Sequence, residues 1–337
     1  MRQTTIARSA VAVTKGPDAG TAPARHAASP RRWLRPVGGL VVLVAVVWWF
    51  GADAFLAGAR TVSAGPVAAA LGIAAVTTLA SAWRWRVVAH GLGLRLPWRA
   101  AVAGCYRSQF LNVVLPGGVV GDVHRGVEHG RDSADLARGI RAVAWERSAG
   151  QAVQLVLVLL VLVALPSPVR AVVAGPAGAG VAAALLAAGL VAVVVLRRRG
   201  GRPVRSRALR TVLADVRHGL LTRRAWPVVV LASLVIVAGH VTVLLVAARA
   251  AGADASLARL APLLLLVLVA SGLPLNIAGW GPREGAAGWL FGLAGMSAQQ
   301  GVATAVVYGV TVLAASLPGA VVLVVSAVRR ARGGRRG

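Results

Sequence analysis

Residues 227–248 read PVVVLASLVIVAGHVTVLLVAA, and this stretch decides the fold class. It contains no acidic residue, lysine or arginine. About 20 such residues in a helix cross roughly 30 Å of hydrocarbon. Further apolar segments occupy residues 37–57, 66–83, 98–120, 142–165, 171–196, 260–279 and 297–327. Together the eight segments predict an all-α polytopic membrane protein.

The overall composition supports the same class. Hydrophobic residues make up 57% of the chain and charged residues 14%, whereas globular proteins are about half apolar and a quarter charged. A soluble core cannot bury that much apolar surface, so helices within a bilayer explain the composition best.

The net charge of +27 raises the question of a nucleic-acid partner. Nearly all arginines lie between the apolar segments or at the two ends of the chain, and no aromatic residues alternate with them to stack on bases. We therefore expect membrane lipids, and not nucleic acid, as partners, with the arginines facing anionic head groups. The sequence does not indicate an oligomeric state.

The two ends of the chain differ from its apolar middle. Residues 1–35 are basic and proline-containing, which predicts a disordered cytoplasmic tail and no cleavable signal peptide. Residues 36–328 form the expected transmembrane domain, and residues 329–337 a basic cytoplasmic tail. Arginine in place of lysine, with abundant Ala, Gly and Val, suggests a bacterial protein of the cytoplasmic (inner) membrane. Cys105 is the only cysteine and is expected to be a packing residue.

The distribution of arginines predicts the topology. If all eight segments crossed the bilayer from a cytoplasmic N-terminus, residues 197–224 with their ten arginines would lie outside, against the positive-inside rule. The conflict disappears if residues 98–120 re-enter from the cytoplasm and residues 260–295 re-enter from outside. This gives about six full spans, two re-entrant helical hairpins and two cytoplasmic termini. Hairpins entering from opposite faces are typical of inverted repeats with polar sites near the midplane.

The first polar cluster, PGGVVGDVHR at residues 116–125, follows the polar residues Arg107 and Asn112 of the first hairpin. Its backbone N–H groups and Arg125 suit a lipid phosphate, and Asp122 and Arg125 share one helix face. The alternative is a surface loop in which Asp122 and Arg125 pair with each other. The turn residues are Pro116, Gly117, Gly118 and Gly121.

The second polar cluster, NIAGWGPREG at residues 276–285, lies between two apolar runs. Its turn residues Gly279, Gly281 and Pro282 predict a helix start at Pro282. Asn276, Arg283 and Glu284 are candidate substrate-binding residues, because charges this deep in apolar sequence usually serve function. The alternative is that Glu284 only caps the helix.

Glu146 and Arg147 begin an apolar segment and, as neighbours on a helix, point to different faces. We expect each to find a partner elsewhere, with Arg107 or Arg125 as candidates for Glu146. An alternative for Arg147 is that it extends to the head groups.

Arg84 and Arg86, interleaved with Trp83 and Trp85, are expected to be interface anchors. His90 and His240 lack metal-ligand spacing and are expected to pack. No catalytic or phosphate-loop motif occurs, so we expect no enzyme activity, cofactor or metal. An enzyme acting on a polyprenyl-linked sugar would need a carboxylate pair, for which Asp122 and Glu146 are the candidates.

An ordered set of motifs spans the chain from about residue 36 to 328. It consists of Trp83-Arg84-Trp85, Pro116-Gly117-Gly118, Gly121-Asp122 with Arg125, Glu146-Arg147, Gly279-Trp280-Gly281-Pro282-Arg283-Glu284 and Leu317-Pro318-Gly319. The set resembles the lysylphosphatidylglycerol synthase transmembrane-region family, also called the flippase-like domain family. The resemblance implies lipid translocation, or lipid modification where a synthase domain is attached. The length of the chain leads us to expect a stand-alone member.

These observations give one leading hypothesis and one rival. The hypothesis is a flippase-like lipid transporter that moves a phospholipid or lipid-linked head group between leaflets. In it Arg107, Arg125 and Arg283 attract the phosphate, and Asp122, Glu146 and Glu284 balance them. The rival is a non-transporting membrane subunit or scaffold that serves a separate synthase or transferase of aminoacyl-lipid or glycolipid synthesis.

Overall fold

The computed structural model describes residues 64–165, 175, 210–272 and 281–333. The predicted segment 37–57, all of the predicted segment 171–196 except residue 175, the tail 1–35 and residues 334–337 lie outside these ranges. Within the described ranges all regular structure is helical, which agrees with the all-α prediction.

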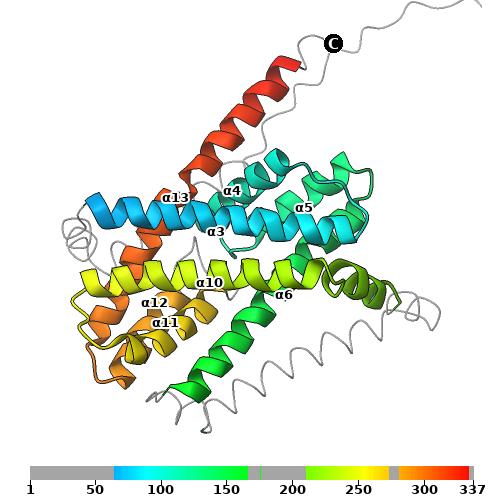
Figure 1. The fold of residues 1–337 in the computed structure, drawn as a ribbon. Coiled ribbons are helices and arrows are strands. Elements are labelled where there is room, and N and C mark those ends of the chain that lie inside the picture. Colours follow the sequence, from blue (N-terminus) through cyan, green and yellow to red (C-terminus); the bar gives the residue numbers. More distant parts are fainter. Residues whose placement is uncertain (1–63, 166–174, 176–209, 273–280, 334–337) are drawn as a thin grey trace, which may run out of the picture.

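Helices α3 (Ala64–Gly91) and α10 (Ala225–Ala250) form a long antiparallel pair (Figure 1). Gly239 of α10 packs on Thr77 near the middle of both helices. At the C-terminal end of α3, Gly91 meets the π-helical turn η1 (Val216–Leu220), where a β-carbon on Gly91 would lie 2.5 Å from the His218 carbonyl oxygen. The sequence predicted a helix only to residue 83, but no helix breaker follows until Gly91 and Gly93, so α3 continues through Arg84 and Arg86.

Helices α4 (Trp98–Val114) and α5 (Val120–Asp132) pack together as the first helical hairpin. Gly117 and Gly118 form its turn with positive φ angles of 91° and 58°. The predicted hairpin 98–120 was too short, because the whole of α4 and the turn occupy it and α5 forms the returning arm. The apolar pattern missed α5 because this helix packs through glycines: a β-carbon on Gly121 would lie 2.0 Å from the Ser108 carbonyl oxygen.

Helices α11 (Leu257–Ser271) and α12 (Pro282–Leu293) pack together as the second hairpin. Helix α12 starts with Pro282 in its first turn, as predicted, after Gly281 at φ 119°. Asn276 and Gly279 lie in the connection outside the described residues.

Helix α13 (Ala298–Gly333) packs against both hairpins (Figure 1). Gly301 contacts Ala287 in the middle of α12, and Gly309 contacts Arg283 at its start. Ten residues further along α13, Gly319 contacts Tyr106 of α4. Along α13, the contacts therefore pass from the middle of α12 to its start and then to the middle of α4 in the first hairpin.

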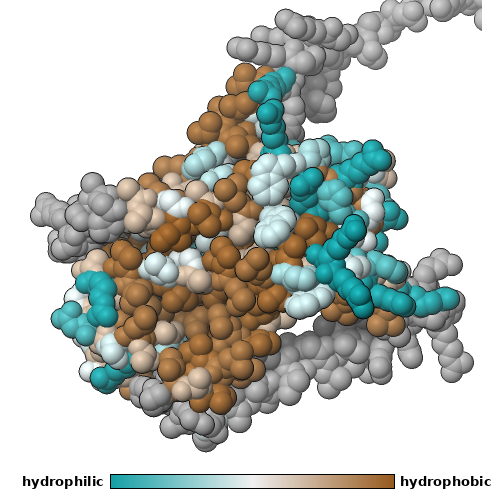
Figure 2. Space-filling view, viewed as in Figure 1, coloured by the Kyte–Doolittle hydropathy of each residue, from teal (hydrophilic) through white to brown (hydrophobic). Residues whose placement is uncertain are grey.

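Three described helical stretches are long and apolar enough to cross a bilayer: α6 (Leu136–Ala164), α10, and residues 298–326 of α13. Figure 2 shows a broad apolar surface in the middle of this face, with hydrophilic residues collected mainly toward one end. The outward face of α6 is exposed and apolar at Leu155, Val156, Leu159, Leu160 and Val163. Such a surface is stable in lipid and not in water, so the chain is an integral membrane protein.

The close helix crossings make a stability prediction. Gly121→Ala and Gly319→Ala place a β-carbon about 2 Å from a backbone carbonyl oxygen, and we expect each to cost about 1–3 kcal/mol by overpacking. Gly72→Ala in α3 is the control, because its β-carbon meets nothing within 4 Å and alanine favours helix. Melting temperatures in detergent measure the effect; a G319A protein that melts at or above the wild-type temperature would contradict the packing described.

Candidate functional site

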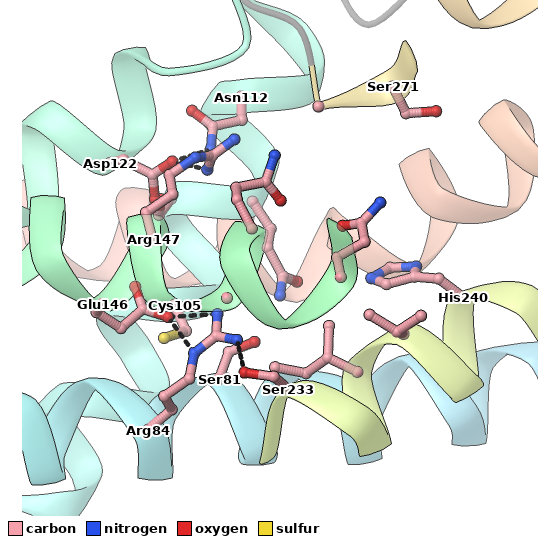
Figure 3. Close-up of a pocket in the computed structure, with 18 of the residues that line it drawn as sticks. Ser81, Arg84, Cys105, Asn112, Asp122, Glu146, Arg147, Ser233, His240 and Ser271 are labelled. Carbon is pink, nitrogen blue, oxygen red and sulfur yellow. Dashed lines mark hydrogen bonds and ion pairs between the residues drawn. The ribbon is translucent and has the colours of Figure 1, made fainter. Parts of the chain in front are cut away.

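A buried charge network lies where α3, α5 and α6 meet, with Glu146 of α6 at its centre (Figure 3). Arg84 of α3 donates to Glu146 Oε1 from Nε at 2.8 Å and from Nη2 at 2.6 Å. Arg125 of α5 donates to Glu146 Oε2 at 2.5 Å. The expected pairing of Glu146 with Arg125 is confirmed, and Arg84 is a second partner that the sequence did not suggest.

Arg84 lies inside the bundle, so its assignment as an interface anchor was wrong. Its guanidinium also donates to Ser233 Oγ of α10 at 2.8 Å, while the neighbouring Trp83 is exposed. Gly150, one turn after Glu146, makes this position possible: a β-carbon there would lie 2.5 Å from Arg84 Nη1.

Asp122, in the first turn of α5, is the second carboxylate of the network. Ser108 donates to Oδ1 at 2.8 Å and Asn112 to Oδ2 at 3.0 Å, while Arg125 approaches Oδ1 to 3.1 Å and Arg147 pairs with Oδ2. Asp122 and Arg125 therefore pair as the alternative interpretation held, but they do so in the interior and not in a surface loop.

Arg125 connects the two carboxylates and packs against two further side chains. Its guanidinium carbon lies 4.8 Å from the ring centroid of Trp85, which is cation–π geometry. Its Nη1 donates to the Cys105 sulfur at 3.3 Å, so Cys105 is buried, as expected for a packing residue, and also accepts a hydrogen bond.

The turn of the first hairpin is tied to α4 by Asn112. The amide oxygen of Asn112 accepts a hydrogen bond from the Gly121 N–H at 2.8 Å, while its amide nitrogen donates to Asp122. The Gly121 N–H, one of the backbone donors expected to receive a phosphate, is thus already used within the protein.

The second hairpin carries its own charge pair, Arg283 and Glu284 at the start of α12. Glu284 accepts a hydrogen bond from the Gly281 N–H at 2.7 Å, so it caps the helix as the alternative interpretation held. Arg283 lies over the ring of Tyr308 at 5.3 Å, and Tyr308 in turn hydrogen-bonds the His240 ring at 2.9 Å. Gly309 makes room for the Arg283 guanidinium as Gly150 does for Arg84.

Two adjoining cavities open beside these charges. The network cavity, of about 250 Å³, is bordered by the arginines and carboxylates around Glu146. The hairpin cavity, of about 260 Å³, is bordered by both hairpin tips, including Gly118 and Arg283, and by α13. Both are lined by Gln109, Asn112, Arg147, His240, Ser271 and Tyr308.

The predicted binding residues divide among these places. Asn112, Asp122, Arg125 and Glu146 line the network cavity, and Arg283 lines the hairpin cavity. Glu284 lines neither cavity and pairs with Arg283. Asn276 lies outside the described residues. Arg107 lines neither cavity and pairs with Glu128 of α5, so it is not a partner of Glu146.

The sequence missed several polar residues that line the network cavity. Gln154 presents an amide nitrogen that is buried without a hydrogen-bond partner among the described residues. Gln151 and Gln154 lie one turn apart on the apolar helix α6, and this spacing could have predicted the polar lining. The polar lining residues not singled out from the sequence are Ser81, Ser108, Gln109, Gln151, Gln154, Ser233, Ser271 and Tyr308.

Comparison with known protein families identifies the chain. The family model of the lysylphosphatidylglycerol synthase TM region matches residues 37–319. The chain belongs to this family. No curated protein and no solved structure gave a significant match.

The lysylphosphatidylglycerol synthase TM region lies within the transmembrane domain expected at 36–328. It includes both hairpins, the charge network and the part of α13 that joins them. Membership of this family associates the chain with membrane lipids.

Glu146→Gln tests the network. The substitution leaves Arg84 and Arg125 buried with a neutral partner, and breaking a buried ion pair costs about 3–5 kcal/mol. Arg138→Gln is the control, because Arg138 pairs with Asp135 at the surface, with side-chain exposures of 43% and 35%; we expect about 1 kcal/mol or less there. Melting temperatures of the purified variants give the comparison, and equal losses in both would show that Glu146 is not the structural centre.

Proposed function

We propose that the protein moves a phospholipid or a lipid-linked head group between the leaflets of the cytoplasmic membrane. One observation carries the proposal: residues from the turn of the first hairpin and from the start of α12, Gly118 and Arg283, border one of two adjoining polar cavities inside an apolar bundle. Charged groups at membrane depth are costly, face the interior of the bundle, and commonly mark the pathway of a polar substrate.

The placement of the chain in the membrane is part of the proposal. The two hairpins re-enter from opposite faces, about six further segments span, and both termini are cytoplasmic. Their facing tips then lie near the midplane, where inverted-repeat transporters hold their substrates. A head group passing between leaflets would cross the hydrocarbon through the hairpin and network cavities while its acyl chains stay in lipid along the apolar exterior.

The charges have different parts in this proposal. Arg283, which lines the hairpin cavity, attracts the phosphate as it passes the second tip. Glu146 and Asp122 hold Arg84 and Arg125 in place. Both carboxylates converge on Arg125 and are already engaged by arginines, so we assign them to the structure of the site and not to acid–base chemistry on a sugar.

Exchange of fluorescent phospholipid between the leaflets of proteoliposomes tests the proposal. We expect the wild-type protein to accelerate exchange and Arg283→Gln to slow it by about tenfold or more, because a positive charge that lines a cavity raises the local concentration of an anionic substrate by at least that factor.

The matched control is Arg259→Gln. Arg259 belongs to the same hairpin but donates to the Ala294 carbonyl and lines neither cavity, so this variant should exchange lipid as fast as the wild type. Folded wild-type protein that accelerates no lipid would reject transport and favour a non-transporting subunit of an aminoacyl-lipid or glycolipid synthesis system.

A further inference from the structure

We propose that Arg147 is the residue that binds the phosphate of the transported lipid, and that the cavities select a head group carrying one net negative charge, such as a phosphodiester with an uncharged alcohol. That the bound lipid is also transported rests on the proposed function. The binding itself follows from the geometry around Arg147.

Arg147 is the accessible arginine of the two cavities. Its side chain is 38% exposed, against 10% or less for Arg84, Arg125 and Arg283. It lines both the network cavity and the hairpin cavity. Figure 3 shows its side chain extending toward Asp122 and Asn112 at the edge of the network. A ligand passing from one cavity to the other meets this guanidinium.

Asp122 loses little when Arg147 turns to a ligand. Its Oδ1 keeps Ser108 and Arg125, and its Oδ2 keeps Asn112. By contrast, Arg125 is fixed between two carboxylates, so moving it would leave two buried charges unpaired. Arg147 is therefore free to exchange one anionic partner for another, while the arginines deeper in the network are not.

The charges bordering the cavities leave a surplus of one positive charge. Arg84 and Arg125 are balanced by Glu146 and Asp122, and Arg283 is balanced by Glu284. Among the described cavity-lining residues, Arg147 is the remaining cation. A single phosphodiester charge neutralises it, and a guanidinium binds two phosphate oxygens at once.

The rest of the lining disfavours a cationic head group. Both carboxylates that line the described cavities, Asp122 and Glu146, already accept hydrogen bonds from arginines. A ligand ammonium would find neutral amides and hydroxyls, such as those of Gln109, Gln151 and Ser271, and no available anion. These neutral groups suit the hydroxyls of an uncharged alcohol such as glycerol.

Binding of short-chain phosphatidylglycerol and phosphatidylcholine of equal acyl length to the purified protein in detergent tests the inference, together with water-soluble glycerol phosphate. We expect phosphatidylglycerol to bind more tightly than phosphatidylcholine, and Arg147→Gln to weaken phosphatidylglycerol binding by about tenfold or more. Arg147→Lys should keep part of the affinity, because lysine retains the charge but not the two-point geometry. Glycerol phosphate that binds as tightly as the lipid would overturn the lipid as the ligand.

Arg141→Gln is the matched control. Arg141 is on the same helix, is similarly exposed at 35%, and pairs with Asp215 away from both cavities. It should bind phosphatidylglycerol as the wild type does. Unchanged phosphatidylglycerol affinity in Arg147→Gln, or equal affinity of the wild type for the two lipids, would overturn the inference.

The two proposals fail separately. If phosphatidylglycerol binding depends on Arg147 but the wild type does not accelerate exchange in liposomes, the binding site stands and transport is rejected. If the wild type accelerates exchange and Arg147→Gln matches it in both exchange and binding, transport stands and the role of Arg147 is rejected. A melting temperature of Arg147→Gln close to that of Arg141→Gln shows that any loss of binding is not a loss of fold.

Discussion

The buried charge network around Glu146 is the constraint on which the rest of the bundle depends. One carboxylate joins Arg84 of α3 to Arg125 of α5, and through Arg84 it reaches Ser233 of α10. Removing such charges from water is costly and is repaid only by good geometry. We infer that the network fixes the register of these helices. Apolar packing alone would allow many registers, because the apolar side chains between the helices resemble the surrounding lipid.

Small residues allow these charges and the hairpin tips to come together. Gly150 and Gly309 leave the space that Arg84 and Arg283 occupy. Gly121 and Gly319 bring α4 within backbone distance of α5 and α13. Helices in lipid associate through such close approaches and not through the hydrophobic effect.

The apolar segments predicted most of the described helices, because the length of an apolar run acts locally along the chain. The opposed entry of the two hairpins, which the count of arginines indicates, stays a prediction. Arg125 was one of two partners predicted for Glu146, because Glu146 and Arg147 are neighbours on a helix and point to different faces. Arg84 was misplaced because its contact with Glu146 spans 62 residues, and no local pattern shows which face of α3 turns inward. Helix α5 was missed because packing through glycines leaves no run of apolar residues in the sequence. The exposure of Arg147 could not be predicted, because it depends on how the helices assemble.

The central claim is that a lipid head group occupies the space between the hairpin tips. A phospholipid with a photoactivatable group on its head group, cross-linked to the protein in membranes and mapped by mass spectrometry, tests it most directly. The account predicts adducts on Gln109 and Ser271, which come from the two hairpins and line both cavities. Adducts confined to the outward face of α6, such as Leu159, would contradict it.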